Sequence, residues 1–369
     1  MPKAAIIGSA SWGTALGIVL ARKGIRVKLW TRAEEIAEEL NMARENTTFL
    51  PGFRFPSRLS ATSSLEEALD KADIVIFAVP AQSMRRNIRE VKDYLRDSIL
   101  IISATKGLEV GSSKRMSQVI AEEINARFHA NICALSGPNI AQETANGLHS
   151  VTVVAAPDIT VGEQAQRLIS SDYFCVFTST DIVGVELGGA LKNVIALGAG
   201  IADGLGYGNN AKATLITRGL AEIIVLGTAV GANPLTFVGL TCLGDIVATC
   251  FSPFSRNHYV GVELAKGRSL KEIMNSMPYV AEGIATTLAA RKMARKAGVD
   301  LPITEQIYKV IYERADVKEA VDDLMGHFAK EEAVEITKFF RPLAHYIRKG
   351  WQRLPPNLLF QSATDDSPS

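Results

Sequence analysis

One lysine lies in the middle of a run of small and apolar residues. Lys192 lies shortly after Gly188 and Gly189 and is followed by Asn193 and then by the apolar Val194 and Ile195. This composition predicts a closely packed helix, in which burial disfavours the charged form of an amine. Such an amine takes the proton of an alcohol as the alcohol is oxidised, and returns it to the ketone in the reverse direction. A buried ion pair with Glu186 or Asp245 is the alternative explanation.

Two further polar groups follow in a similarly apolar setting. Asp245 lies among apolar residues at 243–249, where a carboxylate needs a partner. Ser255, Arg256 and Asn257 offer a hydroxyl, a guanidinium and an amide to phosphate oxygens, although a solvated loop arginine is the alternative.

The charges of the whole chain nearly cancel: Lys plus Arg is 40 and Asp plus Glu is 39, a formal net charge of +1. We therefore expect no nucleic-acid partner and local binding of any anionic substrate.

A glycine-rich turn opens the chain. Gly8-Ser9-Ala10-Ser11-Trp12-Gly13 follows an apolar run and precedes a helical pattern, as in dinucleotide-binding turns. Ala10 replaces the usual middle glycine, and its methyl group is tolerated if φ is negative. A structural turn in an unrelated α/β protein is the alternative.

Two basic residues are expected near the cofactor. Arg32 follows the second predicted strand, where an NAD-only enzyme usually has an acid, and so it suits the 2′-phosphate of NADP. Glu34 and Glu35 leave a solvated helix-cap arginine as the alternative. Lys106 lies in the turn at 103–107, which belongs to the ligand-binding edge of the predicted sheet.

The pattern of apolar residues divides the chain into three parts. Short apolar runs alternate with helical periodicity to about residue 178, which predicts a mostly parallel, Rossmann-like α/β sheet with helices on both faces. After residue 181 the sequence is rich in Gly, Ala and Leu at helical spacing, so residues 181–326 are expected to form an all-α catalytic domain after the NAD(P)-binding domain 1–180. Residues 327–369 are expected to form an extension, with an amphipathic helix at 330–340 and a disordered end at 362–369.

The expected elements are as follows. Strands are predicted at 4–8, 26–30, 59–62, 74–79, 99–104, 132–135, 150–155 and 175–178. Helices are predicted at 12–23, 33–44, 65–71, 83–95, 113–128 and 161–170. The extension is expected to dock on its own domain, because mixed charges on the polar face of 330–340 disfavour a membrane-surface helix.

The cysteines and the apolar runs of the sequence indicate in which cell compartment the protein is expected. Cys133, Cys175, Cys242 and Cys250 show no CxxC pair and no metal-ligand spacing, so we expect reduced core residues, no metal and a cytoplasmic protein. The most membrane-like stretch, 187–205, contains Lys192, Asn193 and Asp203, which disfavours an integral membrane segment. The first 21 residues resemble a signal peptide in composition, but the glycine-rich turn accounts for them better and no cleavage site is evident.

Seven ordered motifs together carry a family resemblance. They lie at 8–16, 49–52, 104–107, 135–139, 186–193, 239–245 and 255–257. With them, residues 2–325 closely resemble the bacterial-type NAD(P)-dependent sn-glycerol-3-phosphate dehydrogenases. The resemblance implies reversible reduction of dihydroxyacetone phosphate, a small-molecule substrate, to sn-glycerol 3-phosphate with NADP or NAD, feeding phospholipid synthesis. It also implies a homodimer.

The resemblance assigns roles to individual residues. It implies catalytic roles for Lys192, Asp245, Lys106 and Thr249. The implied substrate-binding residues are Lys106, Gly137, Asn139, Asn193, Ser255, Arg256 and Asn257. The implied cofactor-binding residues are Gly8, Ser11, Trp12, Gly13, Arg32, Phe49, Lys106, Ala141, Arg256, Val280 and Glu282. Ala10 and the extension depart from the family pattern.

Two other functions are less consistent with the sequence. A hydroxyacyl-CoA dehydrogenase is expected to use a His–Glu pair, and none of the five histidines lies where such a pair is expected. A catalytically silent redox sensor that binds NADP(H) would not need Lys192, Asp245, Arg256 and Asn257 together.

Overall fold

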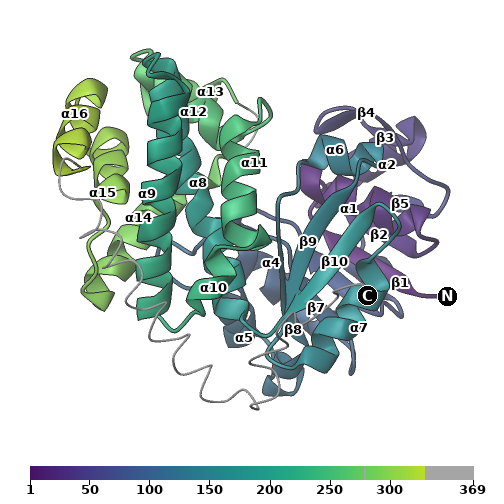
Figure 1. Cartoon of the computed structure of the whole chain (residues 1–369). Helices are drawn as coiled ribbons and strands as arrows, with labels where there is room; N and C mark the ends of the chain where they lie inside the picture. Colours follow the sequence, from purple (N-terminus) through teal and green to yellow (C-terminus); the bar gives the residue numbers. More distant parts are fainter. Residues whose placement is uncertain (278–279, 329–369) are drawn as a thin grey trace, which may run out of the picture.

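The N-terminal part of the protein is an eight-stranded sheet covered by helices (Figure 1). The computed structural model describes residues 1–277 and 280–328. The strand order is β10-β9-β8-β7-β6-β1-β2-β5, and all neighbouring strands are parallel except β8 and β9. The expected Rossmann-like, mostly parallel sheet is therefore confirmed.

The bounds of the elements in this part agree closely with the predicted periodicity. The strands are β1 Lys3–Ile7, β2 Arg26–Trp30, β3 Glu45–Asn46, β4 Leu50–Arg54, β5 Leu59–Thr62, β6 Ile74–Phe77, β7 Leu100–Ser103, β8 Ile132–Ser136, β9 Ser150–Ala155 and β10 Phe174–Ser179. The α-helices are α1 Ser11–Arg22, α2 Glu34–Ala43, α3 Leu65–Leu69, α4 Met84–Val91, α5 Met116–Glu123, α6 Ala141–Asn146 and α7 Ile159–Ile169.

Both faces of the sheet are buried under helices, and alternate residues of each strand point to opposite faces. One face carries Ile6, Ile76 and Ile102 and packs against α1, α2, α6 and α7. The other carries Ile7, Phe77 and Ile101 and packs against α3, α4 and α5. The first strand and helix are thus central to the fold, which accounts for the apolar start of the chain.

Three features of this part differ from the sequence prediction. The hairpin β3–β4 was not expected, because it contains Pro51 and Gly52, which indicate a loop. Helix α6 has six residues, too few to show helical periodicity. The prediction that Cys175 is a core residue was wrong: it lies on the edge strand β10, where residues alternate between buried and exposed. The other three cysteines are buried, and all four are free thiols.

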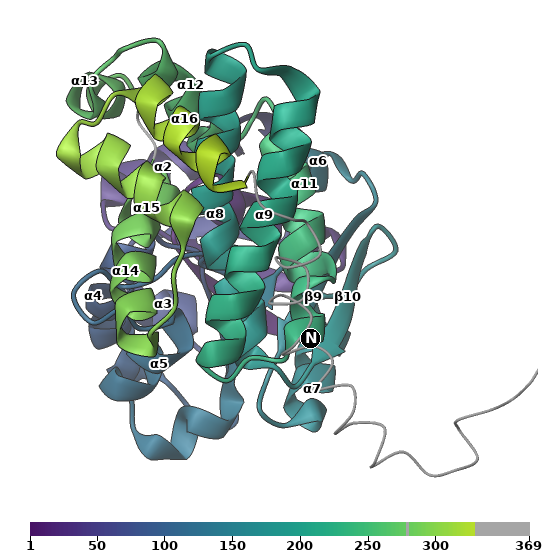
Figure 2. The ribbon, with the colours of Figure 1, turned by 60° about the vertical axis from the view of Figure 1, so that its left-hand side comes forward.

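The second part is helical and is built around α8 Ile182–Gly204 (Figure 2). The other helices are α9 Gly208–Ala229, α10 Pro234–Phe237, α11 Asp245–Phe251, α12 Arg256–Ala265, α13 Leu270–Asn275, α14 Glu282–Ala297, α15 Pro302–Tyr308 and α16 Val317–Phe328. A π-helical turn at Leu240–Gly244 leads into α11. Apolar residues of α8, such as Leu187 and Leu197, are fully buried in one core with the surrounding helices.

Two stretches are long and apolar enough to cross a membrane by length and composition. One is α8, whose most apolar stretch is 89% buried, as expected of a core helix. The other, Pro234–Phe251, comprises α10, the π-helical turn and α11, and is 39% buried. The predicted helix at 330–340 and the rest of the extension from residue 329 lie outside the described residues.

Helix α12 approaches α8 at backbone contact distance. A Cβ on Gly200 of α8 would lie 2.0 Å from the carbonyl oxygen of His258, and a Cβ on Gly261 of α12 would lie 2.1 Å from that of Leu197. Glycines at both positions therefore permit this crossing. The approach also lets His258 Nε2 lie 2.6 Å from a carboxylate oxygen of Asp203.

We predict that Gly261→Ala lowers the stability of the helical part by about 1–3 kcal/mol, because the added methyl group forces two packed helices apart. Gly111→Ala is a matched control, since a Cβ at that exposed turn meets no atom within 4 Å. Thermal unfolding of both variants checks this. A Gly261→Ala transition at or above that of Gly111→Ala contradicts the packing argument.

Candidate active site

A cleft of about 580 Å³ lies where the carboxyl edge of the sheet meets the helical part. The strand order reverses between β1 and β6, the position at which open α/β sheets bind ligands. The cleft is lined from the sheet side by the turns after β1, β6 and β7, and from the helical side by α8, α11, α12 and α14. Predicted residues that line it are Ser11, Trp12, Phe49, Lys106, Asn139, Ala141, Lys192, Asn193, Thr249, Ser255, Arg256, Asn257, Val280 and Glu282.

The glycine-rich turn is shaped by steric limits at its two glycines. Gly8 has φ +114°, and a Cβ there would lie 2.6 Å from the carbonyl oxygen of Ala78. A Cβ on Gly13 would lie 1.9 Å from the carbonyl oxygen of Gly8. Ala10 has φ −77°, which a residue with a side chain adopts readily. The substitution of alanine for the middle glycine is thus compatible with the turn.

The cleft fits a dinucleotide. Ala10 provides no side-chain cap for α1, so the N-terminal N–H groups of that helix suit an anion. Three buried polar atoms of the lining, Trp12 Nε1, Asn139 Oδ1 and Glu282 Oε2, have no hydrogen-bond partner among the described residues. Buried polar groups normally bond, so these atoms are suited to a ligand.

The polar centre of the cleft is a carboxylate between two lysines. Lys192 Nζ donates to Asp245 Oδ1 at 2.8 Å and also to Thr249 Oγ1. Lys106 Nζ donates to Asp245 Oδ2 at 2.6 Å and to the carbonyl oxygen of Gly137 at 2.7 Å. Asp245 is 1% exposed. Each oxygen of one buried carboxylate therefore orients a different lysine.

The charges of this centre favour an anionic ligand. Two lysines and one carboxylate leave an excess positive charge when both amines are protonated. Burial lowers the pKa of Lys106 to about 8, with Lys192 acting in the same direction and Asp245 opposing it. Lys106 is therefore close to titrating at neutral pH.

Two asparagines connect the helices behind this centre. Asn193 Nδ2 donates to the carbonyl oxygen of Lys106 at 3.1 Å, and its Oδ1 accepts from Asn257 Nδ2 at 2.9 Å. Asn257 Oδ1 in turn accepts from the backbone N–H of Gly283 at 2.9 Å. These amides hold α8, α12 and α14 in register at the cleft.

The N-terminus of α12 carries the predicted phosphate-binding residues. The Ser255 hydroxyl accepts from the backbone N–H of His258 and caps the helix, and Arg256 Nη1 lies 3.4 Å from the carbonyl oxygen of Val280. Glu282 Oε1 accepts from the backbone N–H of Ala81 at 2.9 Å. Burial raises the pKa of Glu282 to about 7, although Arg256 opposes this.

A few predicted residues lie behind or beside the cleft. Gly137 and Asp245 are not part of the lining, but Gly137 accepts a hydrogen bond from Lys106 and Asp245 accepts from both Lys106 and Lys192. Arg32 lies outside the lining, where it donates at 2.9 Å to both Glu90 Oε1 and Asn87 Oδ1 and lies over the ring of Trp30. The alternative in which Lys192 pairs with Glu186 was wrong. Glu186 instead binds Arg115 and the backbone N–H of Ser117, linking α8 to α5.

The structure adds one positioning residue that the sequence did not indicate. Buried Asn46 donates to the carbonyl oxygen of Ser9 at 2.7 Å and to Thr14 Oγ1 at 2.8 Å, and accepts from the backbone N–H of Phe49. It thereby fixes Phe49 beside the glycine-rich turn. No spacing in the sequence connects Asn46 with that turn.

Together the Rossmann-like sheet, its glycine-rich turn and the polar cleft at the switch point of the strand order are typical of a dinucleotide-binding dehydrogenase. Comparison with known families specifies it further. The family model described as NAD-dependent glycerol-3-phosphate dehydrogenase N-terminus matches residues 3–161, and that of the C-terminus matches residues 181–322. The chain belongs to the NAD-dependent glycerol-3-phosphate dehydrogenase family.

Individual relatives agree. A glycerol-3-phosphate dehydrogenase [NAD(P)+] of Dehalococcoides mccartyi is 55% identical over 346 residues, covering 92% of this chain and 96% of that protein. A glycerol-3-phosphate dehydrogenase [NAD(P)+] of Bacillus mycoides is 49% identical over 338 residues, which cover 91% of this chain and 99% of that protein. The crystal structure of glycerol-3-phosphate dehydrogenase from Coxiella burnetii matches with a TM-score of 0.83 and 33% sequence identity. The match covers 88% of this chain and 98% of that chain.

We predict that kcat/KM for dihydroxyacetone phosphate falls as pH rises through about 8, because Lys106 loses the charge that attracts the substrate anion. Lys106→Arg keeps a charge at this position and should move the fall to higher pH. Initial rates from pH 6 to 10 measure this. A wild-type profile that stays flat to pH 10 contradicts the role of Lys106.

Proposed function

We propose that Lys192 is the general acid/base of an NAD(P)-dependent glycerol-3-phosphate dehydrogenase that interconverts dihydroxyacetone phosphate and sn-glycerol 3-phosphate. The observation that carries this is the pair of hydrogen bonds from Lys192 Nζ to Asp245 and Thr249 at the wall of the cleft. An ammonium has three N–H groups, so one remains for the C2 oxygen of the substrate.

The proposed reaction assigns one proton to Lys192. In the reductive direction Lys192 polarises the ketone and donates its proton to the C2 oxygen, and in the oxidative direction the neutral amine takes the proton back. Bound NAD(P)H supplies the hydride. Asp245 orients both lysines through its two oxygens. Glycerophospholipid synthesis, which consumes sn-glycerol 3-phosphate, is the context we propose.

Residues around the cleft divide between the two ligands. The cofactor is held by the turn of Gly8 and Gly13, by Phe49, and by the region of Ala141. Val280 and Glu282 border it on the helical side. Residues 1–180 therefore serve chiefly the cofactor, and residues 181–326 supply the acid/base and the substrate phosphate site.

The substrate phosphate is assigned to the N-terminus of α12. Ser255, Arg256 and Asn257 lie there, where the helix dipole favours an anion. The phosphate takes no part in the chemistry, but its binding energy positions C2 against the acid. This makes phosphate recognition a direct test of the proposed function.

We predict that Arg256→Ala lowers kcat/KM for dihydroxyacetone phosphate by the equivalent of about 2–4 kcal/mol, the loss expected for a charged partner of a desolvated anion. Unphosphorylated dihydroxyacetone should be a very poor substrate for both proteins. The informative quantity is the ratio of kcat/KM between the two ketones. A ratio that the substitution leaves unchanged removes Arg256 from the phosphate site.

Arg32 is proposed to favour NADPH through its charge beside the second strand. It is 40% exposed on its side chain and already paired with Glu90, so the 2′-phosphate would compete with a carboxylate for it. We expect NADPH to be used at least as well as NADH. Arg32→Ala should raise KM for NADPH more than KM for NADH, and equal changes argue against contact with the 2′-phosphate.

We further propose a homodimer located in the cytoplasm. Free thiols at all four cysteines are consistent with a reducing compartment. Leu235 of α10 and Val247 and Phe251 of α11 are exposed apolar side chains, and such residues suit contact with a second copy. Light scattering that gives one chain mass, 39.8 kDa, in place of twice that value contradicts the dimer.

A further inference from the structure

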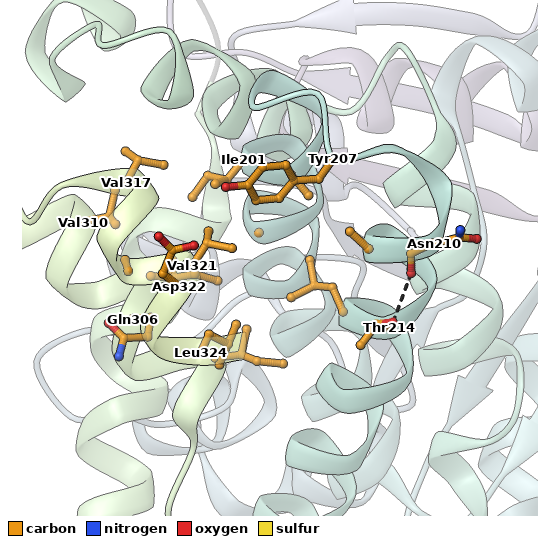
Figure 3. Close-up of a pocket in the computed structure, with 17 residues that line it drawn as sticks. Ile201, Tyr207, Asn210, Thr214, Gln306, Val310, Val317, Val321, Asp322 and Leu324 are labelled. Carbon is orange, nitrogen blue, oxygen red and sulfur yellow. Dashed lines mark hydrogen bonds between the residues drawn. The ribbon is translucent and has the colours of Figure 1, made fainter. Parts of the chain in front are cut away.

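A second cavity lies in the helical part, on the same central helix as the acid/base. It has a volume of about 490 Å³, is open to solvent on one side and is lined by α8, α9, α15 and α16 (Figure 3). Ile201 of α8 lines it, nine residues and so about 14 Å along the helix from Lys192. The lining does not share a residue with the active-site cleft.

The walls of this cavity are mainly apolar. Ile201 faces Val310, Val321 and Leu324 across it (Figure 3), and Leu215 also lines it. Polar side chains, among them Tyr207, Asn210 and Gln306, also contribute to the lining. Asp322 is the one charged residue of the lining in the described part of the chain. An acyl carboxylate or a phosphate would therefore meet no cation here, which disfavours an anionic lipid or metabolite as the occupant.

The end of the described chain lies beside this cavity. Helix α16 supplies one wall with Val317, Val321 and Leu324, and the described chain ends at Phe328, four residues after Leu324. The remaining 41 residues therefore start about 6 Å along the helix from Leu324. A tether this short gives its segment an effective concentration on the order of millimolar at the cavity.

The sequence just beyond Phe328 has apolar residues with the spacing of an apolar helix face. Ala333, Ile336 and Phe340 follow one another at intervals of three and four residues, and Pro342 ends the pattern. Charged residues lie between and around them, at 330–332, 335, 338 and 341. The matched family region ends at residue 322, so this pattern lies outside it.

We propose that residues 329–341 of the same chain are the segment that covers this cavity, and that Ile336 and Phe340 are the apolar residues on which this binding depends. The tail is then an intramolecular partner of α8, α9, α15 and α16. This inference concerns a surface separate from the active site and stands independently of the proposed reaction.

The test compares two substitutions in the full-length chain. Ile336→Glu with Phe340→Glu places charge on the apolar positions, whereas Thr337→Glu with Lys338→Glu places charge on neighbouring polar ones. The probe is 1-anilinonaphthalene-8-sulfonate, whose fluorescence rises on apolar surface, together with amide hydrogen exchange in α9 and α15. Reduction of dihydroxyacetone phosphate confirms that each variant is folded.

We expect the first variant to show several-fold higher dye fluorescence and faster exchange in α9 and α15 than wild type, and the control variant to match wild type. Both effects should be independent of protein concentration. Equal behaviour of the two variants, or strong dye binding by wild type, overturns the proposal. Wild-type protection that disappears on dilution also overturns it, because it identifies a second copy as the occupant.

Discussion

The active site depends on one buried carboxylate, Asp245, that holds two lysines at once. A carboxylate that is 1% exposed is stable in its charged form only with partners, and here each oxygen accepts from a different ammonium. Lys106 comes from the sheet and Lys192 from the helical part. The same interaction that neutralises the buried charge therefore joins the two halves of the cleft and aims two cationic side chains into it.

Close packing of α8 makes this contact possible. A Cβ on Gly189 would lie 2.3 Å from Ser136 Oγ at the end of β8, so this glycine allows the helix to approach the sheet edge. Lys192 follows three residues later, almost one turn along, and the amides of Asn193 and Asn257 hold the neighbouring helices in place. One turn earlier on the face of α8 that carries Gly189, Glu186 binds Arg115 and Ser117 of the sheet domain. Loss of any of these contacts would move Lys192 relative to Lys106.

The sequence predicted the sheet and its main helices because their periodicity is strong and buried on both faces. The ends of β2, β5 and β9 coincide with the predicted ranges. Lys192 and Asp245 could be singled out since an isolated charge in an apolar run is costly unless it has a partner. From the residue types alone the partner of Lys192 stayed open between Glu186 and Asp245, because their distances depend on how the helices are placed in space, and only the family resemblance pointed to Asp245 and Thr249. The roles of Asn46 and Arg115 likewise arise from contacts between distant segments.

The most direct test of the central claim is chemical rescue of Lys192→Ala. We expect kcat for dihydroxyacetone phosphate to fall by at least about 10²-fold, as for the loss of a general acid. NADPH binding, measured by fluorescence titration, should persist, and added methylamine should restore part of the rate. Lys212→Ala is a suitable control, because Lys212 is also buried but pairs with Asp203 outside the lining of the cleft. Turnover of Lys192→Ala near the wild-type rate across the pH range would contradict the account.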